Sequence, residues 1–241
     1  MIRRSLPRRR FNERFDEGAT RMRMRVLIGG SALGLLVGLW PRRARAVARS
    51  GTFEPATVAR LEVAGWRAYY ARNPIAALAV LWRLTRGQFA MPVSVAVRSA
   101  YAAVRAQVAF VGKRGRRDTA FVWLTRFYAL APRRDGSSPF ELAQAEIEYW
   151  VQHRHVVHQS DQSPLVDALA ELHALLFGGT PAEMRASAQE RALACQAVDR
   201  ITGHVSANVA RDWELAEAHL RRAYQLAVAV GLAHARELAV A

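Results

Sequence analysis

Cysteine is almost absent from this chain: Cys195 is the one cysteine among 241 residues. A lone cysteine excludes an intrachain disulfide and a cysteine-rich metal site, and it gives no support to an oxidising compartment. Cys195 lies among alanines in an expected helix, which is typical of a small buried side chain rather than of a reactive thiol. Because 51% of the residues are apolar, the chain is long enough to bury a substantial core.

Lysine is equally rare, since Lys113 is one of 35 basic residues and the other 34 are arginines. Such an imbalance is typical of GC-rich coding, so the number of arginines alone is weak evidence for nucleic-acid binding. The distribution of charge is more informative. Residues 1–50 carry a net +10, residues 51–136 a net +10 and residues 137–241 a net −5. The basic excess suits anionic lipid, and a solvated helical surface explains it equally well.

Strand patterns are also missing, because no segment alternates convincingly and no Asn-Gly hairpin occurs. Helical spacing between proline and glycine breaks predicts an all-α fold, a bundle of roughly seven to eight helices over residues 52–241. Before it we expect a basic tail (1–25), a short apolar helix (26–40) and a basic linker (41–51). The chain has no Walker loop, nucleophile elbow or zincin helix, so we expect no cofactor and favour a non-enzymatic module.

Two helices have strong start signals. Residues 138–141 read Ser-Pro-Phe-Glu and residues 180–183 read Thr-Pro-Ala-Glu, and both are capping boxes with proline at the first helical position. Other expected boundaries are Asp118 as an N-cap, Gly87 as a helix end, Ser206 as the start of the last helix and Gly231 as its bend or end.

The helix that Pro74 opens is apolar nearly all round. Such a helix is either deeply buried or in contact with lipid. Its apolar side chains are Ile75, Leu78, Val80, Leu81, Trp82 and Leu84.

Residues 26–40 form an apolar run that is the most informative segment of the chain: fifteen residues without a charge, with arginines on both sides. As a helix they cover roughly 22 Å of a hydrocarbon core about 30 Å thick. Bilayer thinning and the reach of the flanking arginines can close that gap. The run therefore predicts a single-pass N-terminal anchor and a membrane location.

Three further interpretations of this region stay open. Gly30, Gly34 and Gly38 share one helix face, which favours pairing with a second membrane helix. A cleaved signal with a small-residue site near Ala48 would instead lead to secretion or export. A translation start downstream of the run would remove it altogether.

The densest basic cluster of the chain consists of Lys113, Arg114, Arg116 and Arg117. Its first two residues lie between two glycines. A loop of this composition suits a phosphate, a lipid headgroup or nucleic acid. With the basic N-terminus it supports nonspecific nucleic-acid binding as a second alternative function.

Metal binding is the remaining chemistry to weigh. His155 and His158 have the i, i+3 spacing that lets two imidazoles share a metal, and Asp161 follows. A helix end with solvent-facing histidines is the ordinary explanation of the same pattern. A helical-bundle enzyme or metal protein using Glu148, His153, His155 and His158 is the first alternative function.

Glu146 lies near His153 on the same largely apolar face of that helix. A buried polar pair that fixes packing and an acid–base pair are equally good interpretations. The overall expectation is a membrane-associated helical interaction or structural module, with a protein partner or a second copy of the chain as its contact. Whether the protein has a small-molecule substrate is unknown from the sequence.

Overall fold

The computed structural model describes residues 53–111, 116–131, 137–157 and 159–240, and every element among them is a helix. The all-α prediction is confirmed. Residues 1–52, with the expected tail, apolar helix and linker, lie outside the described residues. The helices are α2 (Pro55–Tyr70), α3 (Pro74–Phe89), α4 (Val93–Phe110), α5 (Arg117–Leu130), α6 (Pro139–Val156), α7 (Ser163–Phe177), α8 (Pro181–Thr202) and α9 (Val209–Val240).

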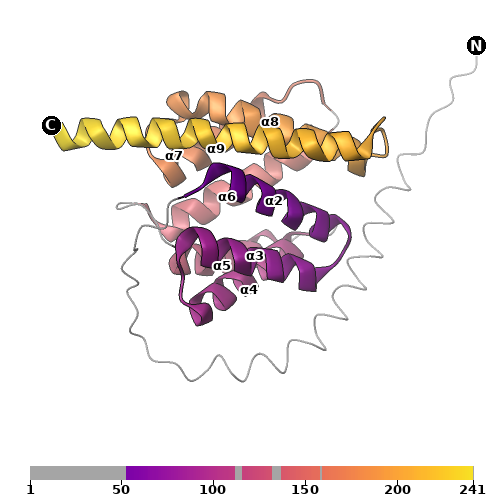
Figure 1. Ribbon diagram of the computed structural model, residues 1–241, viewed down its shortest axis with the longest axis horizontal. Helices are drawn as coiled ribbons and strands as arrows, with labels where there is room; N and C mark the ends of the chain where they lie inside the picture. The colour runs from indigo at the N-terminus through magenta and orange to yellow at the C-terminus, as the bar shows by residue number, and fades with distance from the viewer. Residues whose placement is uncertain (1–52, 112–115, 132–136, 158, 241) are drawn as a thin grey trace, which may run out of the picture.

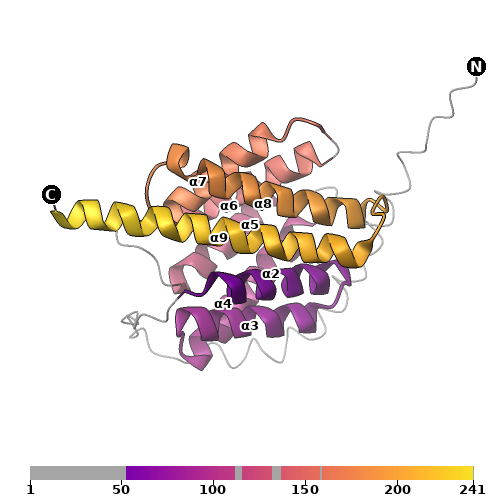
Figure 2. The same cartoon turned by 45° about the horizontal axis from the view of Figure 1, so that its top comes forward.

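These helices form a closed ring, because each packs against the next along the chain and α9 packs back against α2. The ring is flattened into two layers (Figures 1 and 2). One layer holds α8, α9, α2 and α3 side by side, and the other holds α7, α6, α5 and α4. The first and last described helices are therefore neighbours.

Local side-chain chemistry sets the helix starts. Both expected capping boxes are confirmed: Ser138 and Glu141 bond reciprocally at the start of α6, as Thr180 and Glu183 do at the start of α8. Glu54 caps α2 by accepting the Thr57 amide at 2.6 Å. Each cap satisfies amides that the first helical turn leaves without an internal partner.

Three expected boundaries are wrong. Gly87 lies inside α3, which ends two residues later, and Ala90 then takes a left-handed φ of 48°. Asp118 lies in the first turn of α5 rather than at its N-cap. The last helix begins at Val209, where Asn208 accepts the Arg211 amide at 2.9 Å. In each case a neighbouring residue supplies the boundary that the sequence assigned elsewhere.

Gly231 does not end α9, which continues to Val240. A Cβ at this position would lie 2.4 Å from the carbonyl oxygen of Phe177, at the end of α7. The missing side chain thus allows a close approach of two helices. A glycine inside a helix can have this packing role instead of ending the helix.

Alanine dominates the core, with twenty of the thirty-nine buried apolar residues that the structure describes. Small side chains let helices pack closely, and the larger members fill the space between layers. Among the fully buried ones are Leu142, Leu165, Leu169, Leu172, Met184 and Leu220.

Sequence analysis left two alternatives for α3, deep burial and contact with lipid, and the structure overturns deep burial. Of its residues only Ala77 and Thr85 are buried, because α3 lies at the edge of its layer against α2 and α4. Ile75 is 80% exposed and Trp82 is 38% exposed. An apolar helix therefore faces outward on this protein.

Candidate functional site

A buried ion pair joins α2, the first described helix, to α8. Arg191 on α8 donates to Glu62 on α2, with Nη2 to Oε1 at 2.5 Å and Nη1 to Oε2 at 3.4 Å. Tyr224 on α9 accepts from Arg191 Nη1 at 2.7 Å and donates its own hydroxyl to Glu62. Three helices of one layer thus share one hydrogen-bonded group.

The opposite layer reaches this group through Tyr149 on α6. The Arg191 guanidinium lies 5.5 Å from the centroid of the Tyr149 ring, and the Tyr149 hydroxyl is 3.6 Å from Cys195 Sγ. Burial is the largest single influence and lowers the pKa of Arg191, but Glu62, together with Tyr224, Tyr149 and Cys195, raises the pKa well above its ordinary value. Burial raises the pKa of Cys195 to about 12, so its thiol stays protonated.

Glu146 forms a second polar contact between neighbouring helices. Its carboxylate accepts from the Tyr128 hydroxyl at 2.8 Å and from Trp150 Nε1 at 3.0 Å. Burial raises the pKa of Glu146, although Arg191 acts in the opposite direction. We call this group and the Arg191 group together the polar centre: Glu62, Tyr128, Glu146, Tyr149, Trp150, Arg191, Cys195 and Tyr224.

Glu146 and His153 do not form the expected pair, because the hydrogen bonds of each residue go to other partners. His153 Nε2 lies 3.1 Å from both carboxylate oxygens of Asp199 on α8, and its ring stacks on Tyr149. Glu146 accepts instead from Trp150, one turn away on the same helix. The helix pattern placed Glu146 and His153 on one face of α6 but did not reveal the partners that α5 and α8 bring to them.

The proposed metal ligands are only partly described. His155 is exposed, and Asp161 uses its carboxylate to accept the Ser163 amide at 2.9 Å beside the start of α7. His158 lies outside the described residues. Within residues 53–111, 116–131, 137–157 and 159–240, no group of three histidine, cysteine or carboxylate side chains is arranged to hold a metal. The His155–His158–Asp161 site stays a prediction.

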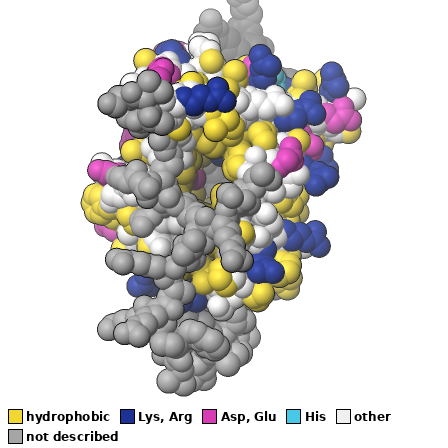
Figure 3. All heavy atoms as spheres, turned by 60° about the vertical axis from the view of Figure 1, so that its left-hand side comes forward, with side chains coloured by type: hydrophobic (Ala, Val, Ile, Leu, Met, Phe, Trp, Pro, Cys, Tyr) yellow, Lys and Arg dark blue, Asp and Glu magenta, His cyan; other side chains and the backbone are white. Residues whose placement is uncertain are grey.

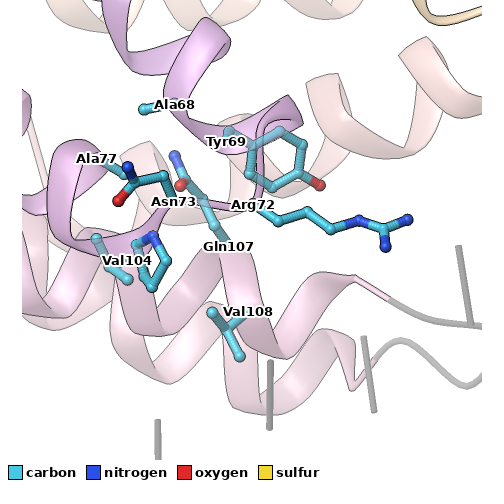
Figure 4. A pocket seen from close by; sticks show the side chains of 9 residues that line it. Ala68, Tyr69, Arg72, Asn73, Ala77, Val104, Gln107 and Val108 are labelled. Carbon is cyan, nitrogen blue, oxygen red and sulfur yellow. The ribbon is translucent and has the colours of Figure 1, made fainter. Parts of the chain in front are cut away.

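Near the end of α2 lies a small hollow (Figure 4). Tyr69, Arg72, Asn73 and Gln107 are among the residues that line it, and its surface is mainly apolar. Its volume of about 10 Å³ is close to the space of one water molecule. A substrate-sized molecule does not fit this hollow.

Charge is separated across the ring. In Figure 1, α3, α4 and α5 lie on the lower side and α7, α8 and α9 on the upper side. The described residues from 71 to 131 hold eight arginines and one acid, Asp118, whereas those from 137 to 240 hold eight arginines and thirteen acids. Of the expected basic cluster, Arg116 and Arg117 are exposed at the start of α5, and Lys113 and Arg114 lie outside the described residues.

Apolar side chains accompany the arginines on α3. We define the α3 stripe as the exposed residues Ile75, Ala79, Trp82, Arg83 and Arg86, which follow helical spacing along one side of the helix. On the face in Figure 3, hydrophobic side chains likewise lie among arginines.

Sequence analysis missed Glu62, Arg191 and Tyr224 altogether. Each is one polar residue in an ordinary amphipathic helix, and nothing local distinguishes it from a solvent-facing residue. The signal that was available is weak: Arg191 falls among alanines that the helical period of α8 directs inward.

No family model matches this chain, and neither a curated protein nor a solved structure matches it. Among the described residues, none of the helices combines the length and the apolar character needed to cross a bilayer.

Proposed function

We propose that this protein is a membrane-associated, non-enzymatic interaction module that residues 26–40 tether to a bilayer. The observation that carries the proposal is the charge separation across the ring, with eight arginines and one acid in the described residues from 71 to 131. A basic side chain near anionic lipid gains about 1 kcal/mol, whereas acidic side chains are repelled. The α3–α5 side would face the bilayer and the α7–α9 side the solvent.

The polar centre supports an interaction module over an enzyme. Arg191, Glu62 and Tyr224 direct their hydrogen bonds at one another, and Glu146 accepts from two ring-bearing side chains. Groups bonded in this way hold helices together, and their donors and acceptors are already engaged with one another rather than available to a substrate. The described hollow near Tyr69 has room for about one water molecule.

Cell fractionation of the full chain tests the anchor. Leu33→Arg combined with Leu36→Arg places two charges in the apolar run, each at about 2.5 to 3.5 kcal/mol. That exceeds the few kcal/mol that eight strong apolar residues contribute at about 0.3 to 0.6 each. We expect the unchanged protein in the membrane fraction and the double variant in the soluble fraction.

The matched control replaces two exposed leucines elsewhere, Leu193→Arg with Leu232→Arg, and should leave the distribution unchanged. An unchanged protein that is wholly soluble at low salt contradicts the proposal, as does an anchor variant that still fractionates with membranes. Mass analysis of the native N-terminus separates an intact anchor from cleavage near Ala48 and from a later translation start.

A further inference from the structure

We infer that the α3 stripe docks on an anionic phospholipid surface and so orients the bundle on the bilayer. The inference rests on the proposed membrane association and adds the contact surface. Three of its members, Ile75, Ala79 and Trp82, are apolar and exposed. A helix that lies on a bilayer buries such a face at the boundary between headgroups and acyl chains.

Ile75 and Trp82 suit that depth. Ile75 is 80% exposed, the highest fraction among the large exposed hydrophobic residues of the described part. Trp82, two turns further along, has an apolar ring system and one polar N–H, a combination enriched at membrane interfaces. Water is a poor environment for both side chains, and the interface satisfies both.

The arginine end of the stripe supplies the charge that anionic headgroups require. Arg83 and Arg86 are exposed, and Arg86 is steadied by donating from Nη1 to the Met91 carbonyl at 2.8 Å. Neither α3 nor α4 contains an aspartate or glutamate. Headgroup phosphates and carboxylates therefore meet positive charge without competing acids on these two helices.

The chain path brings the stripe close to the proposed anchor. The Glu54 amide donates to Gln88 Oε1 at 2.8 Å, so the start of α2 lies beside the end of α3. Thirteen residues, 41–53, connect Glu54 with the apolar run, and thirteen residues span at most about 45 Å. A tether of this length keeps α3 within reach of the surface that the run enters.

Other occupants fit less well. A nucleic acid would pair with Arg83 and Arg86, but it offers no apolar phase to Ile75. A second copy of the chain would bring the acid-free surface of α3 and α4 against itself, and like charges oppose that contact.

A spin label on the full chain in vesicles tests the docking directly. Ile75→Cys carries the nitroxide, and Cys195 does not compete because it is buried and its thiol pKa is raised to about 12. Collisions with oxygen report lipid, and collisions with a water-soluble nickel chelate report solvent. The matched control is Val205→Cys, which is 72% exposed between α8 and α9.

With vesicles of phosphatidylcholine and phosphatidylserine, we expect the label at position 75 to be shielded from nickel and exposed to oxygen, and the label at 205 to stay in water. Equal nickel access at both positions, while the protein still sediments with the vesicles, overturns the docking and leaves the anchor intact. A protein that does not sediment overturns the anchor as well. Shielding without vesicles, or shielding by duplex DNA, assigns the stripe to a second copy or to nucleic acid and also overturns it.

Charge is tested on the same labelled chain. Arg83→Gln with Arg86→Gln removes two favourable charges, each worth about fivefold in the ratio of docked to undocked label. We therefore expect that ratio to fall at least tenfold, and the same loss in pure phosphatidylcholine vesicles. Arg185→Gln with Arg211→Gln removes two exposed charges from the acidic half and should leave the ratio unchanged. Equal effects of the two pairs contradict a specific arginine contribution.

Discussion

Arg191 and Glu62 lie 129 residues apart in the sequence, and their side chains meet at 2.5 Å between α8 and α2. The pair reinforces the closure of the ring, since among the described helices α2 is the first and α8 and α9 supply its contacts on that side. Its side chains are 10% and 16% exposed, so each charge has little access to water. Each of the two charges is therefore stabilised mainly by the other side chain of the pair rather than by water.

Removing one charge of this pair should destabilise the protein strongly. Arg191→Met leaves Glu62 buried without its cation, which typically lowers the free energy of unfolding by about 3–5 kcal/mol. Urea denaturation measures the loss. Arg211→Met in the exposed Arg211–Glu214 pair is the control and should cost less than about 1 kcal/mol. The double variant Glu62→Leu/Arg191→Met should lose less than the two single losses together, because it leaves no buried charge. Additive losses would contradict this account.

Two glycines should respond oppositely to alanine. At Gly231 a new Cβ would meet the backbone oxygen of Phe177 at 2.4 Å, and the forced separation of α9 from α7 should cost about 1–3 kcal/mol. At Gly87 a new Cβ meets nothing within 4 Å, so Gly87→Ala should stabilise α3 by up to about 1 kcal/mol. Thermal or urea unfolding of both variants decides the matter, and a stabilised Gly231→Ala protein would refute the close approach.

His173 should make stability depend on pH. Ser187 donates to the Ala223 carbonyl at 2.8 Å, so His173 Nδ1 donates to Ser187 and Nε2 is unprotonated, with no hydrogen-bond partner among the described residues. Burial, with Arg191 as a smaller cause, lowers the pKa of His173 from 6.5 to about 3. Between these values the unfolded chain binds the proton and the folded chain does not, so stability falls as pH falls.

From pH 7 to pH 5 this one residue should remove roughly 2 kcal/mol from the free energy of unfolding. Urea titrations at several pH values give the slope, and His173→Asn, which keeps a donor near Nδ1, should flatten it. His155→Asn is the exposed control and should not. The raised pKa of Glu146 acts with the opposite sign in both proteins and so cancels from the comparison. An equal slope with and without His173 would show that the residue is not buried neutral.

Cys195 should be inert in the folded protein. Its thiol is 2% exposed, and its pKa of about 12 leaves almost no thiolate at neutral pH. Reaction with a disulfide reagent should therefore follow unfolding, accelerate with urea and be complete in denaturant. Prompt modification without denaturant would show that the contact between α6 and α8 opens readily.

The local sequence was enough to predict the helix starts at residues 138–141 and 180–183, because a capping box consists of four consecutive residues. It was not enough at Gly231, whose role depends on the carbonyl of Phe177. Nor did it predict that α3 would face outward. Whether an apolar helix is buried or exposed depends on its place in the ring, and α3 lies at an edge.

The sequence by itself determined the helical class, the local caps and the division into a basic and an acidic half, because these depend on composition and on residues within one turn of each other. Only the tertiary structure decided that Glu62, Arg191 and Tyr224 form one group and that Glu146 bonds to Tyr128 rather than to His153. Those contacts join residues from separate helices. Which side chains meet there depends on the order, tilt and rotation of the packed helices, and no single stretch of the chain contains that information.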